Sequence, residues 1–228
     1  MRYLLTLVGA IVANFVFAQQ ITYQQFIEDA KTEINLQPEY GNVQKSDAMK
    51  HDDDAFISTA LKADTTAQKA SEHMVRLGFT YLYRGDFETA MKRFNQAWLL
   101  NPKNENVYWG YGSVYGSFGD YATAIKQFDK GLLLNPNSPV ILTDKATMYF
   151  VQFQQDGDQS KLSTALGLLN KSFGIDATNV NTAYKLSICY FLGKDCANAW
   201  KFYDVCKKLG GQPIAENYTA ALKSACPK

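Results

Sequence analysis

One segment of the chain, from Ser71 to Ser138, contains the same unit twice. Residues 85–94 read GDFETAMKRF, and residues 119–128 read GDYATAIKQF. The sequence Leu-Leu-Asn-Pro closes both copies at the same spacing, at 99–102 and at 133–136. Self-similarity at a fixed period of this size is typical of solenoids, in which each unit buries its apolar face only against its neighbours. The repeat therefore predicts a stacked architecture.

Each copy has the residues expected of two helices joined by a tight turn. In the first copy, Gly85 and Asp86 provide the turn and a cap for the second helix. Gly78 in the first helix has no side chain, which allows the second helix to approach closely. Pro102 cannot continue a helix and ends the unit. Small and large residues alternate along one stripe of the second helix, at steps of four and three, so that two helices can interlock: Ala90, Phe94 and Ala97.

Together these features resemble the tetratricopeptide repeat, a helix–turn–helix unit of about 34 residues. The resemblance covers residues 71–211, clearly in two units and in a degenerate form in two more. It implies an all-α fold, a right-handed α-solenoid of helical hairpins that binds another protein. The implied organisation is an N-terminal helical cap segment (19–70), four repeats (71–104, 105–138, 139–179 and 180–211) and a C-terminal capping helix (212–228).

The third repeat is longer than the first two. The extra residues are polar, and we expect them to form an inter-helix loop at 152–160. Asp156, Asp158 and Ser160 resemble the first ligands of a calcium loop. However, Lys161 and Gly167 stand where an EF-hand requires Gly and Glu, so the sequence excludes an EF-hand. We expect a surface insertion that borders the binding face as a weak second site.

Residues 1–18 have the layout of a secretory signal peptide. Arg2 precedes an apolar run over 4–17, and Val16 and Ala18 place small residues at the −3 and −1 positions. The run is shorter than the roughly 20 apolar residues of a membrane span, although an uncleaved anchor is the alternative. No cysteine lies nearby to indicate a lipoprotein anchor. We expect cleavage after Ala18 and export to the periplasm or cell envelope of a bacterium.

Between the signal and the repeats, the sequence predicts two helices. The first runs over 21–36 with Thr22 as its N-cap, and the second runs from about Ser46 to Asp64. Together they are interpreted as a degenerate hairpin that caps the stack. His51 precedes three aspartates at 52–54, but four consecutive helical residues point in different directions, so we expect solvated charges rather than a metal site.

Composition and motifs argue against nucleic-acid binding and catalysis. The full chain has 23 basic and 22 acidic residues, and loss of Arg2 with the signal leaves 22 of each. A neutral chain lacks the charge expected of a protein that binds nucleic acid or an anionic membrane surface. The sequence has no Gly-rich phosphate loop, His-Glu-x-x-His, Gly-x-Ser-x-Gly or Cys-x-x-Cys, and its only histidines are His51 and His73. We predict no enzymatic activity, no cofactor and no metal.

All four cysteines lie near the C-terminal end of the chain, at 189, 196, 206 and 226. In an exported protein this clustering favours a disulfide. Cys196 and Cys206 are ten residues apart on one predicted helix, about 15 Å by helical rise, so they are too far apart to pair. A hairpin that turns near residues 210–211 brings Cys226 back opposite Cys196, which predicts the pair Cys196–Cys226. The alternative is Cys189–Cys196 across the turn at Gly193.

The resemblance also implies a concave groove lined by the first helices of the repeats. The family's clamp for chaperone C-terminal carboxylates is missing, since Val75, Phe79, Gly110, Val140 and Asp144 occupy its positions. An aromatic groove suits an extended or helical apolar segment of a partner. The alternatives are packing of these aromatics between repeats, a groove filled by a terminal segment, self-association, and a small-molecule or glycan ligand. The predicted groove residues are Arg76, Phe79, Tyr83, Trp109, Ser113, Asp144, Phe150, Tyr184, Lys185 and Phe191.

Overall fold

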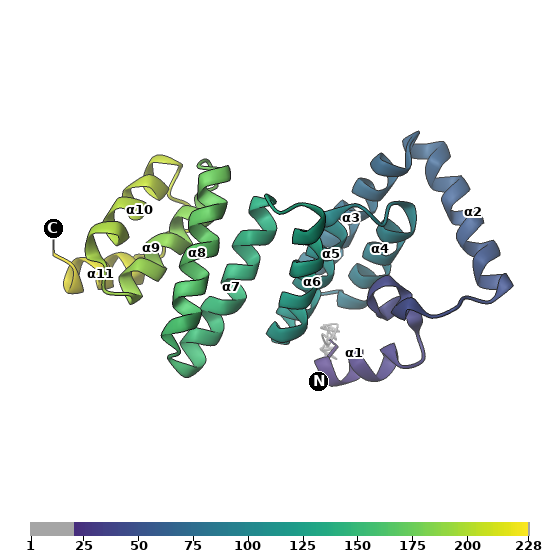
Figure 1. The fold of residues 1–228 in the computed structure, drawn as a ribbon, viewed down its shortest axis with the longest axis horizontal. Coiled ribbons are helices and arrows are strands. Elements are labelled where there is room, and N and C mark those ends of the chain that lie inside the picture. The colour runs from purple at the N-terminus through teal and green to yellow at the C-terminus, as the bar shows by residue number, and fades with distance from the viewer. Residues whose placement is uncertain (1–20, 228) are drawn as a thin grey trace, which may run out of the picture.

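Figure 1 shows a row of helices standing side by side, in a computed structural model that describes residues 21–227. These residues form α-helices and short 3-10 helices (η), and no strand occurs among them. The predicted signal peptide lies outside the described residues. None of the helices in this part of the chain is both long enough and apolar enough to cross a membrane. The elements are α1 (Tyr23–Ala30), η1 (Ile34–Leu36), η2 (Pro38–Asn42), α2 (Asp47–Asp64), α3 (Ala67–Tyr83), α4 (Phe87–Leu100), α5 (Glu105–Ser117), α6 (Tyr121–Leu134), α7 (Pro139–Asp156), α8 (Gln159–Ile175), α9 (Val180–Leu192), α10 (Cys196–Lys208) and α11 (Glu216–Ala225).

Helices α3 to α10 pair in order into four hairpins, as the repeat predicts. In the first two hairpins the turn glycines, Gly85 and Gly119, have φ of +78° and +84°, a region that residues with a side chain rarely adopt. The aspartate after each glycine caps the second helix. Asp86 accepts a hydrogen bond from the backbone N–H of Thr89, and Asp120 does the same at the start of α6. The Gly-Asp pair therefore fixes both the turn and the helix start.

Close contact between helices in the first two hairpins depends on glycines that face a phenylalanine ring. A Cβ atom added to Gly78 would lie 2.4 Å from the ring of Phe94, and one added to Gly112 would lie 2.4 Å from the ring of Phe128. The close approach predicted at Gly78 is therefore confirmed. Gly110 of α5 faces the same Phe94 ring, and a Cβ atom added there would lie 2.3 Å from the ring. The Phe94 ring therefore packs against both the first and the second hairpin.

The third hairpin differs from the prediction in how its two helices are connected. Its helices α7 and α8 have 18 and 17 residues, whereas α5 and α6 have 13 and 14. The extra residues extend both helices, because residues 140–156 contain neither Gly nor Pro to stop α7. Gly157, with φ of +74°, ends α7, and the side chain of Asp158 caps α8 by accepting from Ser160 N–H. The polar loop expected at 152–160 is wrong, and Gly157 and Asp158 alone connect the two helices.

The first helix is shorter than expected. It begins with the predicted N-cap, Thr22, whose side chain and that of Gln25 form a reciprocal capping box. It ends at Ala30, where the backbone carbonyl accepts a hydrogen bond of 2.6 Å from Gln37 Nε2. The chain then continues through η1 and η2, and the extended backbone at Glu33 (φ −102°, ψ 95°) prevents a continuous helix. The single helix expected over 21–36 is therefore wrong.

Residues 21–43, which we call the N-terminal strap, pack along the first two hairpins and do not pair with α2. The Phe26 ring lies 5.0 Å from that of Phe118 and 6.3 Å from that of Tyr115, measured between centroids. Farther along, Glu39 forms an ion pair of 2.9 Å with Lys130 of α6. Helix α2 instead packs on α3 at the end of the stack, in the part of Figure 1 farthest from the C-terminus. The two predicted helices therefore occupy separate places rather than forming a hairpin.

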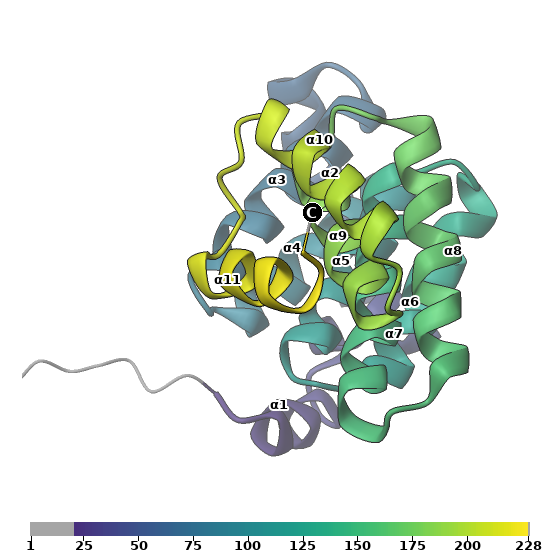
Figure 2. The same ribbon diagram turned by 90° about the vertical axis from the view of Figure 1, so that its left-hand side faces the viewer.

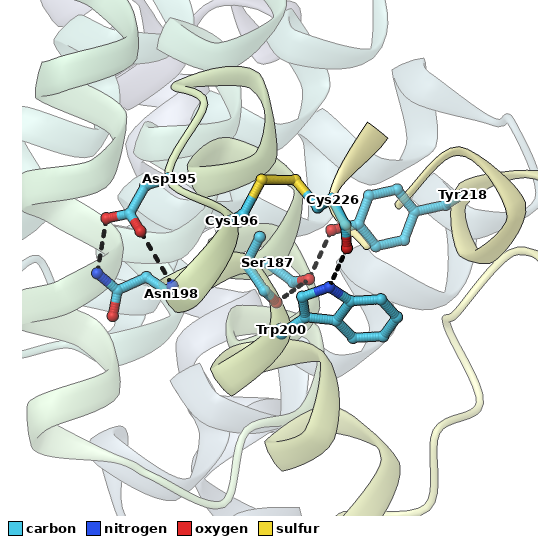
Figure 3. Close-up of a disulfide and its surroundings, with 8 residues drawn as sticks. Ser187, Asp195, Cys196, Asn198, Trp200, Tyr218 and Cys226 are labelled. Atoms are coloured by element: carbon cyan, nitrogen blue, oxygen red, sulfur yellow. Dashed lines mark hydrogen bonds between the residues drawn. A yellow bond between two sulfur atoms is a disulfide. The ribbon is translucent and has the colours of Figure 1, made fainter. Parts of the chain in front are cut away.

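The other end of the stack is closed by α11, which faces the viewer in Figure 2 and packs on α9 and α10. The predicted disulfide, Cys196–Cys226, is present and joins the start of α10 to the end of α11, with 5.4 Å between the Cα atoms (Figure 3). Trp200 Nε1 donates a 2.7 Å hydrogen bond to the carbonyl of Cys226. The alternative pairing through Cys189 is wrong. That thiol is free, and burial raises its pKa to about 12.

The Cys226→Ser variant is expected to lose about 3–4 kcal/mol of unfolding free energy, because the disulfide closes a loop of 30 residues and restricts the unfolded chain. Urea unfolding with and without a reductant measures the loss, and hydrogen exchange shows whether α11 opens first. Reduction of the wild type should give the same loss, and reductant should not change the variant further. Equal midpoints for oxidised wild type and variant would contradict this prediction.

Candidate binding groove

The first helices of the four hairpins, α3, α5, α7 and α9, contact one another in order and form one face of the stack, which we call the groove. Two pockets open on this face. One lies mainly between α3 and α5 and is called the α3–α5 pocket, and the other lies between α7 and α9 and is called the α7–α9 pocket. Seven of the ten predicted groove residues line one pocket or the other.

The α3–α5 pocket has a volume of about 480 Å³. The ring of Phe79 packs against Trp109, with 4.1 Å between centroids, and is only 8% exposed, so its main role is to join the two helices. Tyr83 is 78% exposed, which leaves its ring available to a partner. Four predicted residues, Arg76, Phe79, Tyr83 and Trp109, line this pocket. Its other lining residues were not among the ten predicted groove residues: Glu72, Val75, Thr80, Asn104, Asn106 and Val140.

A chain of polar contacts, which we call the polar bridge, crosses the groove from α5 to α9. Trp109 Nε1 donates a 2.7 Å hydrogen bond to Asp144 of α7, and Lys185 Nζ of α9 lies 3.7 Å from the same carboxylate. Lys185 also donates to the hydroxyl of Thr147 at 2.7 Å. The bridge brings together three predicted residues and fixes three helices relative to one another.

The α7–α9 pocket has a volume of about 210 Å³ and contains three of the predicted residues, Phe150, Tyr184 and Lys185. Five of the other lining residues come from α7 and α9: Ala146, Thr147, Val151, Ile188 and Cys189. The helical spacing carried a signal for some of them, because Ile188 lies one turn after Tyr184. Leu169 comes from α8, the second helix of its hairpin, whereas the family resemblance assigns the groove to first helices.

Two predicted residues do not line either pocket and make no part of the polar bridge. The Ser113 hydroxyl donates a 2.8 Å hydrogen bond to the carbonyl of Trp109 in its own helix. Phe191 packs against Tyr218 of α11, with 5.8 Å between ring centroids. The ring of Tyr184 also packs against Tyr218, with 5.6 Å between ring centroids, and the Tyr184 hydroxyl accepts a hydrogen bond from the backbone N–H of Ala215. The C-terminal segment therefore covers the α9 end of the groove, which was one of the alternatives.

The polar residues of the described part of the chain do not gather into a metal-binding cluster. Residues 21–227 contain no group of three or more His, Cys, Asp or Glu side chains that could hold a metal ion. His73 Nδ1 lies 2.9 Å from a carboxylate oxygen of Asp64, and His51 is exposed. The groove presents aromatic rings, an exposed guanidinium and the polar bridge. Groups of this kind can recognise a ligand.

Comparisons with known proteins agree with this geometry. The family model described as tetratricopeptide repeat matches residues 81–147. The chain is similar to a structure of PilF from Pseudomonas aeruginosa (16% identity, TM-score 0.55), and the match covers 63% of this chain and 62% of that one. It is also similar to TTC0263, a thermophilic TPR protein of Thermus thermophilus (16% identity, TM-score 0.56), over 68% of this chain and 79% of that one. The fold is a tetratricopeptide repeat solenoid.

The chain is also similar to MamA from Desulfovibrio magneticus RS-1, with 19% identity and a TM-score of 0.53, and the match covers 68% of this chain and 82% of that one. The chain spans less than two thirds of the PilF structure. No curated protein sequence matches it. At these identities the likeness shows the fold alone, so the ligand of the tetratricopeptide groove has to be argued from its own residues.

Proposed function

We propose that the chain is a non-enzymatic scaffold of the cell envelope that binds a segment of another protein along the groove. The observation that supports this most directly is the open α3–α5 pocket, where the exposed Tyr83 and Arg76 stand beside Trp109. Tyrosine, tryptophan and arginine are the residue types that dominate the binding energy of protein interfaces. The assignment to the envelope rests on the signal peptide predicted over residues 1–18.

The pocket holds two charged side chains, Arg76 and Glu72, and the guanidinium of Arg76 favours a peptide segment over an apolar small molecule. Among residues 21–227, Arg76 takes part in none of the ion pairs, and its side chain is exposed. A guanidinium in this setting can form a bidentate pair with a carboxylate. A partner segment with an acidic residue beside an apolar or aromatic residue would satisfy both Arg76 and Tyr83.

The test is capture of the partner from the envelope fraction of the source cell by immobilised wild type and variants. Tyr83→Ala and Arg76→Ala should each lower the amount captured at least tenfold, which is about 1.4 kcal/mol, because each removes an exposed anchor and leaves the buried residues unchanged. Trp109 and Tyr184 are poorer choices, since one holds the polar bridge and the other helps to seat α11.

Leu133→Ala is the matched control, because Leu133 is as exposed (82%) as Tyr83 but lies on α6, outside the groove. Its capture should equal that of the wild type, and circular dichroism should show the same helicity in all variants. Undiminished capture by both groove variants would contradict the proposal. Self-association is measured separately by sedimentation, and the groove variants should leave it unchanged.

A further inference from the structure

The α7–α9 pocket differs from the rest of the groove in the chemistry of its wall. Its polar side chains already have partners: the Thr147 hydroxyl donates to the carbonyl of Thr143 at 2.9 Å and accepts from Lys185, and the Tyr184 hydroxyl accepts from Ala215 N–H at 3.2 Å. A sugar or a nucleotide would therefore lose hydrogen bonds to water on entering and find few replacements. The wall favours an apolar occupant.

The volume sets the size of that occupant. At about 210 Å³ the pocket exceeds the engineered cavities of about 150 Å³ that bind benzene. Since a water molecule takes a share of about 30 Å³ in the liquid, the pocket has room for roughly seven non-hydrogen atoms. A phenylalanine, leucine, isoleucine or methionine side chain fits this limit, and a long acyl chain exceeds it.

The position of the pocket indicates where this side chain comes from. Lys185 lines the pocket and also belongs to the polar bridge, whose other end, Trp109, lines the α3–α5 pocket. The two pockets are therefore joined by a continuous set of contacts across α5, α7 and α9. One extended segment that lies along the groove passes both of them.

We propose that the α7–α9 pocket is a specificity pocket that receives one large apolar side chain of the bound partner segment. This inference rests on the proposed function and adds to it the side-chain class that the segment must carry. The α3–α5 pocket binds an acidic residue and a neighbouring apolar or aromatic residue of the segment, and the α7–α9 pocket binds a single large apolar side chain.

The experiment uses a random peptide library displayed on phage and selected on the full-length protein, followed by affinity measurements with the selected peptides. The peptides should share a Phe, Leu, Ile or Met at a fixed position, and its replacement by Ala should weaken binding at least tenfold, because the pocket buries such a side chain away from water. Val151→Phe, which fills the pocket, should weaken binding equally, whereas Leu133→Ala should not change it.

Ile188→Phe is a second filling variant if Val151→Phe does not fold, and toluene is a direct probe of the pocket. Saturating toluene should shift the NMR signals of the methyl groups of Val151 and Ile188 in the wild type and not in a filled variant. Peptides that need Tyr83 but tolerate both filling variants would overturn the specificity pocket and leave the groove proposal standing. Failure to select any peptide, with no toluene shift, would overturn both.

Discussion

Replacing Phe94 by alanine is expected to lower the free energy of unfolding by about 3–5 kcal/mol, the usual range for loss of a buried aromatic ring. The Phe94 side chain is fully buried. Its ring contacts Phe79 and Tyr111, with centroid distances of 5.2 and 6.4 Å, and fills the space that Gly78 and Gly110 leave open. Helix backbones cannot close around the missing ring without moving both hairpins, so most of the cavity should remain.

Urea unfolding followed by circular dichroism measures this loss. Phe56→Ala is the control, because Phe56 is half-buried in α2 outside the hairpins and should cost much less. Gly110→Ala should also destabilise, since its Cβ would overlap the Phe94 ring. The double variant Gly110→Ala with Phe94→Leu should lose less than the sum of the two single losses. Strict additivity would show that the ring and the glycine do not interact as described.

Asn95→Ala is expected to cost about 3 kcal/mol, because it leaves buried polar groups without partners at about 1–3 kcal/mol each. Asn95 Nδ2 donates to the backbone carbonyls of Asn35 and Gln37 at 2.7 and 2.9 Å, and Asn95 Oδ1 accepts from the hydroxyl of Tyr111 at 2.6 Å. The same hydroxyl accepts from Glu39 N–H at 3.2 Å. One fully buried amide thus holds the N-terminal strap to α4 and α5.

Two measurements separate loss of the strap from general unfolding. Urea unfolding gives the total loss, and hydrogen exchange should show faster exchange at residues 34–43 than in α7 to α10. Asn170→Ala is the matched control, because the Asn170 amide also makes hydrogen bonds but lies exposed on α8, and it should cost no more than about 0.5 kcal/mol. If the two asparagine variants lose the same amount, the strap is not held by Asn95.

The sequence by itself determined the helical hairpins, because everything that defines them lies within one repeat unit. Each repeat contains its own turn, at Gly85 and Asp86 in the first copy. It also contains both members of the close contact between Gly78 and the Phe94 ring, so their spacing in the sequence alone shows that they meet. Of the two pairings that the sequence left open, Cys196–Cys226 was favoured because a turn near residues 210–211 places Cys226 opposite Cys196, and this pairing is the one that forms.

The tertiary structure alone decided how the N-terminal strap, the groove and α11 are arranged. The strap is held by contacts between residues far apart in the sequence, such as Tyr23 with Asp120 and Asn35 with Asn95, and no periodic pattern links such pairs. The polar bridge through Asp144 depends on three helices meeting, and the cover over Phe191 depends on where α11 packs. Repetition specifies contacts between neighbours, whereas contacts outside the repeat depend on the shape and hydrogen-bonding groups of the assembled surface.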